Sequence, residues 1–107
     1  MKKSIVQSDP SKCYLCGKNG AADRLEKHHI FGAYNRKKSE EDGEFVWLCG
    51  DACHRNGPNA AHRSKETARR LHEEGQSAWE KVYGTRAEFL KRYKKNYLEE
   101  EENGEIH

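Results

Sequence analysis

Four cysteines stand in two close pairs, and their spacing is the strongest chemical signal in this sequence. Cys13 and Cys16 are separated by two residues, and Cys49 and Cys53 by three. Zinc takes four ligands in a tetrahedron, and two thiolate pairs can share one ion when folding brings them together. We therefore expect one structural zinc, which in small metal-binding domains contributes about 10–16 kcal/mol of apparent folding free energy at neutral pH.

Three other interpretations of the cysteines stay open. All four could be ordinary buried thiols. Cys13 and Cys16 could form a redox pair, although the βαβ context of thioredoxin-like motifs is absent. His54 could replace Cys53 as the fourth zinc ligand. We favour Cys53, because this choice leaves His54 free for a second site.

Histidines near these cysteines suggest a second metal site. His28 and His29 are adjacent, His54 directly follows Cys53, and His62 lies just before the expected long helix. A zinc ion joining the two cysteine pairs would draw these histidines together. Neutral imidazole is a ligand for divalent transition metals and a general base near neutral pH, so the group is suited to catalysis.

Several histidines have alternative interpretations. His28 could be a hydrogen-bonded structural side chain, and His62 could contact a phosphate or cap a helix. His72 falls on the apolar face of the expected helix, so we predict that it belongs to the core.

Two strands are expected before the long helix. Residues 25–31 could form a short strand, and residues 44–49 (EFVWLC) are the best strand in the chain because they are aromatic and β-branched. The charged segment 32–43 between them is expected to be a loop, and the strands to form an antiparallel hairpin. Residues 51–61 are expected to be a second loop, punctuated by glycine and proline.

From residue 64 onward the pattern becomes helical. Apolar residues fall three and four positions apart over residues 68–82, with Ser64 as the expected N-cap and Gly84 as the stop. The capping box Thr85-x-x-Glu88 predicts a second helix. The strands and this helix pair predict an α+β fold.

Composition separates a basic body from an acidic end. Only 34% of the 107 residues are hydrophobic and 36% are charged. The core is therefore small, and we expect a bound metal or another cross-link to stabilise it. Residues 99–107 hold five of the 18 acidic residues and no lysine or arginine, which leaves residues 1–98 with a net charge of +7. We expect a flexible leader (1–11), one domain (12–98) and a disordered acidic tail (99–107). A basic body favours a polyanionic partner.

The sequence carries no signal for a membrane or for secretion. No apolar run approaches the ~20 residues that span a bilayer, and the N-terminus lacks the apolar stretch of a signal peptide. We therefore expect a cytoplasmic protein, in which paired cysteines favour a metal over a disulfide.

The motif residues resemble a known family, the HNH endonucleases of the ββα-metal (His-Me finger) type. More narrowly, they look like the small zinc-knuckle HNH proteins of bacteriophages. The resemblance covers about residues 12–83 and is carried by His28-His29-Ile30, by the strand Phe45-Val46-Trp47-Leu48-Cys49 and by Cys53-His54. It implies a ββα-metal core with a structural zinc knuckle, and metal-dependent hydrolysis of DNA in a bacterial or phage-infected cell.

The resemblance also implies roles for the histidines. His29 corresponds to the general base that activates water, and His28 and His54 to ligands of a divalent metal. His62 is the candidate for a further ligand. The implied cofactors are structural Zn²⁺ and catalytic Mg²⁺ or another divalent cation.

One motif position departs from the family. The middle asparagine that braces the base is replaced by Glu44. Asn35 is one candidate for that bracing role, and Glu44 itself is the other. Adjacent strand residues point to opposite faces, so His28 and His29 can share a site only if the strand ends or bends there.

DNA is the expected partner, together with other phage or host DNA-processing proteins, and the protein is expected to act as a monomer or weak dimer. A non-catalytic zinc module that binds nucleic acid or protein is the alternative function. Cations near the motif supply candidate phosphate contacts, which would give salt-sensitive affinity with weak sequence preference. These cations are Arg36, Lys37, Lys38, Arg55, Arg63 and Lys65.

Overall fold

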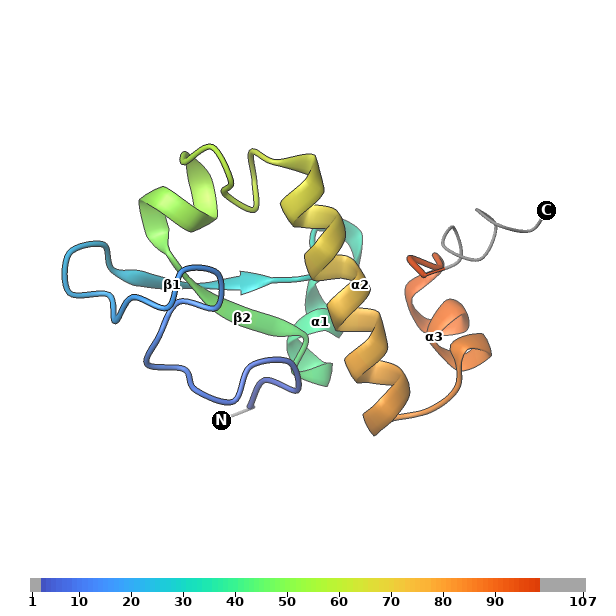
Figure 1. Ribbon diagram of the computed structural model, residues 1–107. Coiled ribbons are helices and arrows are strands. Elements are labelled where there is room, and N and C mark those ends of the chain that lie inside the picture. The colour runs from blue at the N-terminus through green and yellow to red at the C-terminus, as the bar shows by residue number, and fades with distance from the viewer. Residues whose placement is uncertain (1–2, 99–107) are drawn as a thin grey trace.

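The computed structural model describes residues 3–98 and shows a small α+β protein with a two-stranded sheet (Figure 1). The expected acidic tail, residues 99–107, lies outside the described residues. No helix in residues 3–98 is long and apolar enough to cross a membrane. The elements are β1 (Leu25–His29), η1 (Ala33–Asn35), α1 (Arg36–Asp42), β2 (Phe45–Cys49), η2 (Gly50–Arg55), α2 (Lys65–Val82) and α3 (Arg86–Tyr93).

The two strands pair antiparallel, which confirms the expected hairpin. His28 lies opposite Val46, and His29 lies opposite Phe45. Because side chains alternate along a strand, the register sorts them onto two faces. We call the face with Glu26, His28, Val46 and Leu48 the inner face, and the face with Lys27, His29, Phe45 and Trp47 the outer face.

The segment between the strands is not the expected loop, because it folds into η1 and α1. The polar side chain of Ser39 anchors α1: its hydroxyl accepts from Phe31 N at 3.1 Å and donates to Glu44 O at 2.6 Å. Gly43 ends the helix with a φ of 75°. Because α1 is held by a serine and by charged side chains, its sequence does not show the regular spacing of hydrophobic residues that usually predicts a helix.

The first residues are also more ordered than expected. Ile5 N donates to Gly43 O at 2.8 Å, and the Ser4 hydroxyl donates to Phe45 O at 2.6 Å. Trp47 N donates to the Gln7 side chain at 2.8 Å. Residues 4–7 therefore pack along β2 instead of forming a loose leader.

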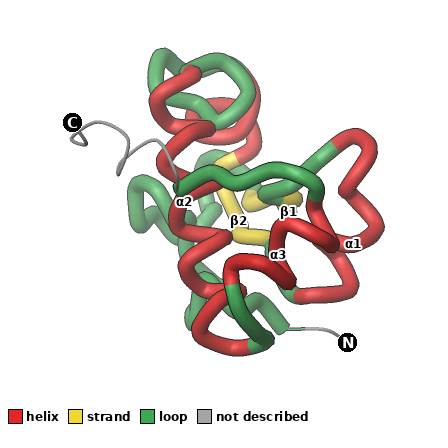
Figure 2. The backbone as a smooth tube through the Cα atoms, turned by 90° about the vertical axis from the view of Figure 1, so that its right-hand side faces the viewer, coloured by secondary structure: helices red, strands yellow, loops and turns green. Residues whose placement is uncertain are grey.

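Both helices after residue 64 begin where the sequence predicts. The Ser64 hydroxyl accepts from Thr67 N at 3.1 Å at the start of α2, and the Thr85–Glu88 capping box opens α3. The helix α2 ends at Val82, two residues before the expected stop. Figure 2 shows α3 packed beside α2 and α1.

A buried carboxylate ties these helices together. Asp42, at the end of α1, accepts from Trp79 Nε1 at 2.9 Å and from the Tyr93 hydroxyl at 2.8 Å. Arg92 Nε donates to the same carboxylate at 2.6 Å. Since α2 and α3 both bond to one residue, Asp42 fixes the C-terminal helix pair against the hairpin connection.

Candidate metal centres

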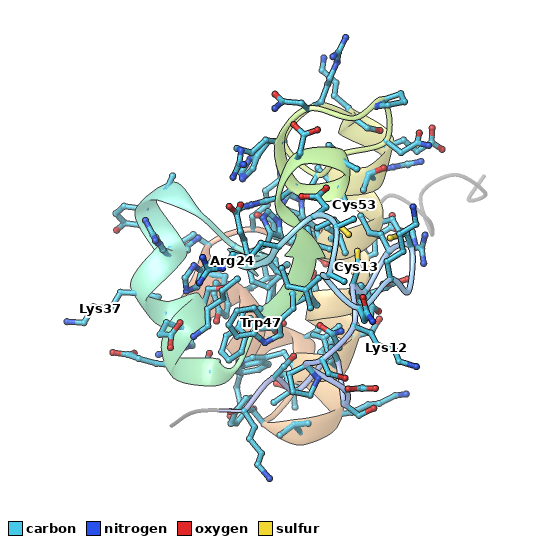
Figure 3. The ribbon with its side chains drawn as sticks, turned by 90° about the vertical axis from the view of Figure 1, so that its left-hand side faces the viewer. Lys12, Cys13, Arg24, Lys37, Trp47 and Cys53 are labelled. Atoms are coloured by element: carbon cyan, nitrogen blue, oxygen red, sulfur yellow. The ribbon has the colours of Figure 1, made fainter. Side chains whose placement is uncertain are left out.

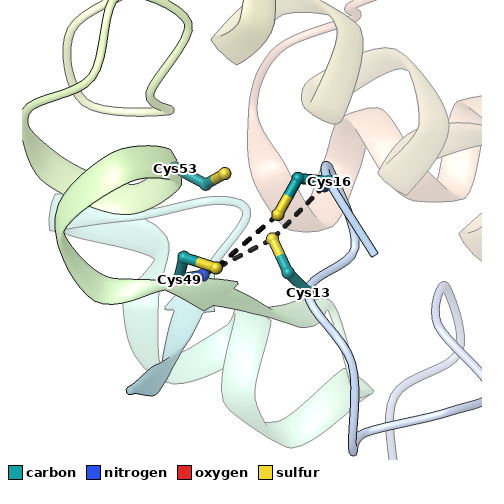
Figure 4. A group of neighbouring side chains, drawn as sticks. All are labelled: Cys13, Cys16, Cys49 and Cys53. Atoms are coloured by element: carbon teal, nitrogen blue, oxygen red, sulfur yellow. Dashed lines mark hydrogen bonds between the residues drawn. The ribbon is translucent and has the colours of Figure 1, made fainter. Parts of the chain in front are cut away.

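Four sulfur atoms meet beside the end of β2 (Figure 4). The Sγ atoms of Cys13, Cys16, Cys49 and Cys53 all lie within 4.8 Å of one another, and Cys16 Sγ is 3.6 Å from Cys49 Sγ. In a tetrahedron with 2.3 Å bonds to zinc, neighbouring sulfurs are about 3.8 Å apart. The four cysteines could therefore hold one metal ion, as their spacing predicts.

Backbone N–H groups around Cys13 favour the thiolate form of its side chain. Gly17, with a φ of 80°, closes the turn by donating its N–H to Cys13 O at 2.9 Å. The N–H groups of Cys16 and Cys49 both point at Cys13 Sγ, each at 3.4 Å. Burial opposes ionisation, but these N–H groups lower the pKa of Cys13 to about 7. A metal ion at this site would therefore meet a sulfur that is already easily deprotonated.

Three imidazoles form a second cluster. The nearest ring nitrogens of His28, His54 and His62 lie within 4.8 Å of one another. The ring centroids are 4.7 to 5.2 Å apart. His28 comes from the inner face of β1, His54 from η2, and His62 from the segment before α2.

Backbone hydrogen bonds hold two of these ligands in place. Asp23 accepts from the N–H groups of Asp51 and Ala52, both at 2.9 Å, and so fixes the first turn of η2. The returning chain then pairs with η2, because His62 N donates to His54 O at 3.0 Å. Residues 51–55 of the expected loop 51–61 are therefore helical, as part of η2, and the whole segment is ordered around His54.

Glu26 lies behind His54 and sets the direction of its ring. The His54 Nδ1 atom is 2.8 Å from Glu26 Oε1, and Arg55 bonds to the same oxygen. The hydrogen bonds from Arg55 and His54 lower the pKa of Glu26 to about 2, so this carboxylate is ionised at neutral pH. Nδ1 of His54 therefore carries the hydrogen, and Nε2 is left for a metal. Glu26 was not among the residues predicted from the sequence.

His28 is the buried member of the cluster. Its exposed fraction is 8%. Burial, followed by the neighbouring imidazoles, lowers the pKa of His28 to about 3. The ring is therefore neutral at physiological pH, which is the form that binds metals.

His29 lies on the outer face and is not part of the cluster. Its Nε2 atom is 2.6 Å from Glu40 Oε1, and its side chain is 14% exposed. The hydrogen bond to His29 is the main cause that lowers the pKa of Glu40. β1 ends at His29, but the rings of His28 and His29 remain on opposite faces of the hairpin, so the structure does not bring His29 into the histidine cluster.

Neither residue suggested to brace His29 does so. Asn35 donates its side-chain N–H to Tyr93 O at 3.1 Å, which ties η1 to α3. Glu44 is fully buried, and its carboxyl oxygens have no hydrogen-bond partner within residues 3–98. Burial raises the pKa of Glu44 to about 9. Glu40, which was not among the residues predicted from the sequence, makes the contact that was expected of Asn35 or Glu44.

The expected phosphate contacts divide into two groups. Arg36, Lys37 and Lys65 are exposed. The other three cations have partners within the protein. Lys38 donates to Arg92 O at 2.9 Å, Arg63 donates to Asn56 O at 3.1 Å, and Arg55 pairs with Glu26.

His72 lies outside both clusters, as predicted for a core residue. Its ring stacks on Phe31 with centroids 5.6 Å apart, and it also packs against Tyr97 at 4.5 Å.

No family model, no curated protein and no solved structure matches this chain.

Proposed function

We propose that this protein is a metal-dependent endonuclease of the HNH, or ββα-metal, type that hydrolyses phosphodiester bonds of DNA. One observation carries the proposal. The imidazoles of His28, His54 and His62 converge beside the end of β1, and His29, the residue after His28, is held by the carboxylate of Glu40. A hydrolytic site needs both an open metal centre and a base, and this arrangement supplies candidates for each.

The sulfur cluster is assigned to a structural zinc ion. Sets of four cysteines are typical of closed structural zinc sites, in which the protein supplies every ligand. Among residues 3–98 the histidine cluster offers three protein ligands, which would leave a coordination position open, as in catalytic sites.

The donor set bears on which cation the histidine cluster would take. Imidazole nitrogen suits Zn²⁺ and other transition metals, whereas Mg²⁺ prefers oxygen ligands. Three nitrogens therefore favour a transition metal over Mg²⁺. When bound by His28, His54 and His62, such an ion would stabilise the charge that develops on the phosphate and on the leaving 3′ oxygen.

His29 is assigned the role of general base. Its Nε2 atom is engaged by Glu40 at 2.6 Å, which leaves Nδ1 to accept a proton from water. The carboxylate fixes the tautomer of the ring and stabilises the imidazolium that forms, as an orienting acid does in other hydrolases. Glu40 thereby takes the bracing role of the missing motif asparagine.

A plasmid assay tests this proposal. Supercoiled plasmid is incubated with the zinc-loaded protein and with added Mn²⁺, Co²⁺, Ni²⁺, Zn²⁺ or Mg²⁺. We expect nicking with at least one transition metal, and a loss of about 10²–10⁴-fold in His29→Ala, which is the usual contribution of a general base.

Lys27→Ala is the matched control for His29→Ala. Lys27 lies on the same face of β1 and also contacts Glu40, at 3.2 Å, but an ammonium group offers no lone pair to water. Its removal should lower the activity less than His29→Ala does, because the proposed base is retained. A plasmid that stays intact with every cation would instead favour the non-catalytic binding module.

A further inference from the structure

The outer face of the hairpin carries a groove that the proposed chemistry does not use. It encloses about 700 Å³ and is lined mainly by apolar surface, with Phe45 and Trp47 from β2, Lys27 from β1, and Lys3 and Pro10 among the residues on the leader side. Figure 3 shows Trp47 on this side of the protein, between α1 and the first residues of the chain.

Trp47 is the aromatic ring that this groove leaves available. Phe45 is only 2% exposed, and the Lys27 ammonium covers its ring at 4.2 Å from the centroid. Trp47 is half-buried, and its backbone groups are occupied: its N–H bonds to Gln7 and its carbonyl accepts from Tyr14 N at 2.8 Å. The strand is therefore held firmly while Trp47 stays partly exposed, with Lys27 Nζ 5.7 Å from the centroid of its ring.

The surroundings of Trp47 are basic. Lys3 and Lys27 line the groove, and no acidic residue of the described chain lines it, although Lys27 is paired with Glu40 at 3.2 Å. Arg24, Lys12 and Lys37 are exposed and lie on the side of the protein that Figure 3 turns toward the viewer. A planar apolar ring inside a rim of cations fits a ligand that is itself planar and carries negative charge. A nucleotide has both properties.

The position of the groove connects it with His29. The pair Lys27–Trp47 and the pair His29–Phe45 lie on the same face, two residues apart along the strands. This spacing is about 6.6–6.8 Å. A nucleotide bound over Trp47 would therefore extend its backbone toward the proposed general base.

We infer that the outer face binds an unpaired nucleotide of a DNA strand, with its base stacked on the indole of Trp47 and its phosphates among the surrounding cations. The choice of DNA rests on the proposed function. Proteins that bind single strands combine stacking rings with a cationic groove in this way. A base inside a duplex is stacked on both sides and cannot lie on Trp47 without leaving the helix. The substrate class is thus DNA with an unpaired segment.

Binding of a fluorescein-labelled oligothymidylate of about ten nucleotides, a length within the range of single-strand sites, tests the inference. Anisotropy is measured on the full chain loaded with zinc and without further divalent cation, so that cleavage does not interfere. Trp47→Ala should weaken binding about tenfold, Trp47→Phe should weaken it less, and a blunt duplex should bind equally to all three proteins.

Val82→Ala is the control for a lost exposed apolar side chain. Val82 is 56% exposed at the end of α2 and does not line the groove, so this variant should bind the oligonucleotide like the unaltered protein. Equal single-strand affinities of folded Trp47→Ala and unaltered protein would overturn the inference. Equal weakening of single-strand and duplex binding would also overturn it.

Intrinsic fluorescence gives a second measurement, which does not depend on Trp47→Ala being folded. The oligonucleotide should quench the unaltered protein, because a base stacks on Trp47. In Trp47→Phe the remaining tryptophan is Trp79, which is 6% exposed, and its emission should not change. Equal quenching in the two proteins would contradict stacking on Trp47. None of these readouts requires cleavage, so a failed plasmid assay would remove the proposed catalysis without deciding this inference.

Discussion

Replacing Glu26 with alanine should weaken metal binding at the histidine cluster without affecting the sulfur cluster. Glu26 Oε1 is 2.8 Å from His54 Nδ1, and this contact leaves Nε2 of the ring free for a metal. Without it, the ring of His54, whose side chain is only 15% exposed, keeps its place but loses its fixed orientation and tautomer.

The expected loss is about 10- to 100-fold in metal affinity, because this is the usual effect of removing a carboxylate that orients a metal-binding histidine. It corresponds to about 1.4–2.7 kcal/mol of binding free energy. Arg55 also loses a partner in this variant, so Arg55→Ala should be measured beside it. We expect the smaller effect from Arg55→Ala, because His54 then retains its hydrogen bond to Glu26.

The assay is a competition titration of Zn²⁺ against a chromophoric chelator, after the four thiolates have been saturated. Glu40→Ala is the matched variant, because Glu40 makes a similar contact, at 2.6 Å, with a histidine outside the cluster. It should bind Zn²⁺ normally but nick plasmid about tenfold more slowly or worse, since the proposed base loses its orienting partner.

Two results would refute this reasoning. Unchanged Zn²⁺ affinity in Glu26→Ala would mean that the carboxylate does not orient a ligand. Equal loss of affinity in Glu26→Ala and Glu40→Ala would mean that the two carboxylates act through general stability or charge.

Three further predictions concern stability. Cys13→Ser should unfold the protein, because the apparent contribution of structural zinc, about 10–16 kcal/mol, exceeds the net stability of most small domains; circular dichroism and zinc content check this, and a folded, zinc-loaded variant would contradict it. Glu44→Gln should stabilise the protein increasingly as pH rises from about 5 to about 9. Burial raises the pKa of Glu44 to about 9, so over this range the folded state keeps a proton that the unfolded state releases. The unaltered protein should therefore lose up to about 1.4 kcal/mol of stability per pH unit relative to the variant. Urea titrations at pH 5 and pH 8 measure the difference, and a pH-independent difference would argue against a buried neutral carboxyl. Gly75→Ala should lower the melting temperature by overpacking worth about 1–3 kcal/mol, because the added Cβ would lie 2.9 Å from both Glu44 Oε1 and Ile30 Cγ2; a higher melting temperature would show that α2 can move away.

The sequence predicts the parts of this fold that depend on short, regular patterns. The cysteine spacing predicts the sulfur cluster, and the capping box at Thr85 predicts the start of α3. The alternation of side chains predicts that His28 and His29 lie on opposite faces. The same rule places Glu26 on the face of His28, so this partner of His54 could have been found.

Other features depend on contacts that no local pattern reveals. Segment 32–43 has the composition of a loop, but α1 is held by the buried hydroxyl of Ser39 and by the contacts of Glu40 with β1. Without α1, Glu40 cannot be placed beside His29. The motif position of Glu44 suggested a bracing role, but packing against Gly75 buries its side chain instead.

Because Cys53 and His54 are adjacent in the chain, a movement of one cluster's ligand also moves a ligand of the other cluster. One peptide unit joins a ligand of the sulfur cluster to a ligand of the histidine cluster, and η2 carries both. An oxidant or chelator that released Cys53 would therefore displace His54 as well, so damage to the sulfur ligands would also disrupt the histidine cluster.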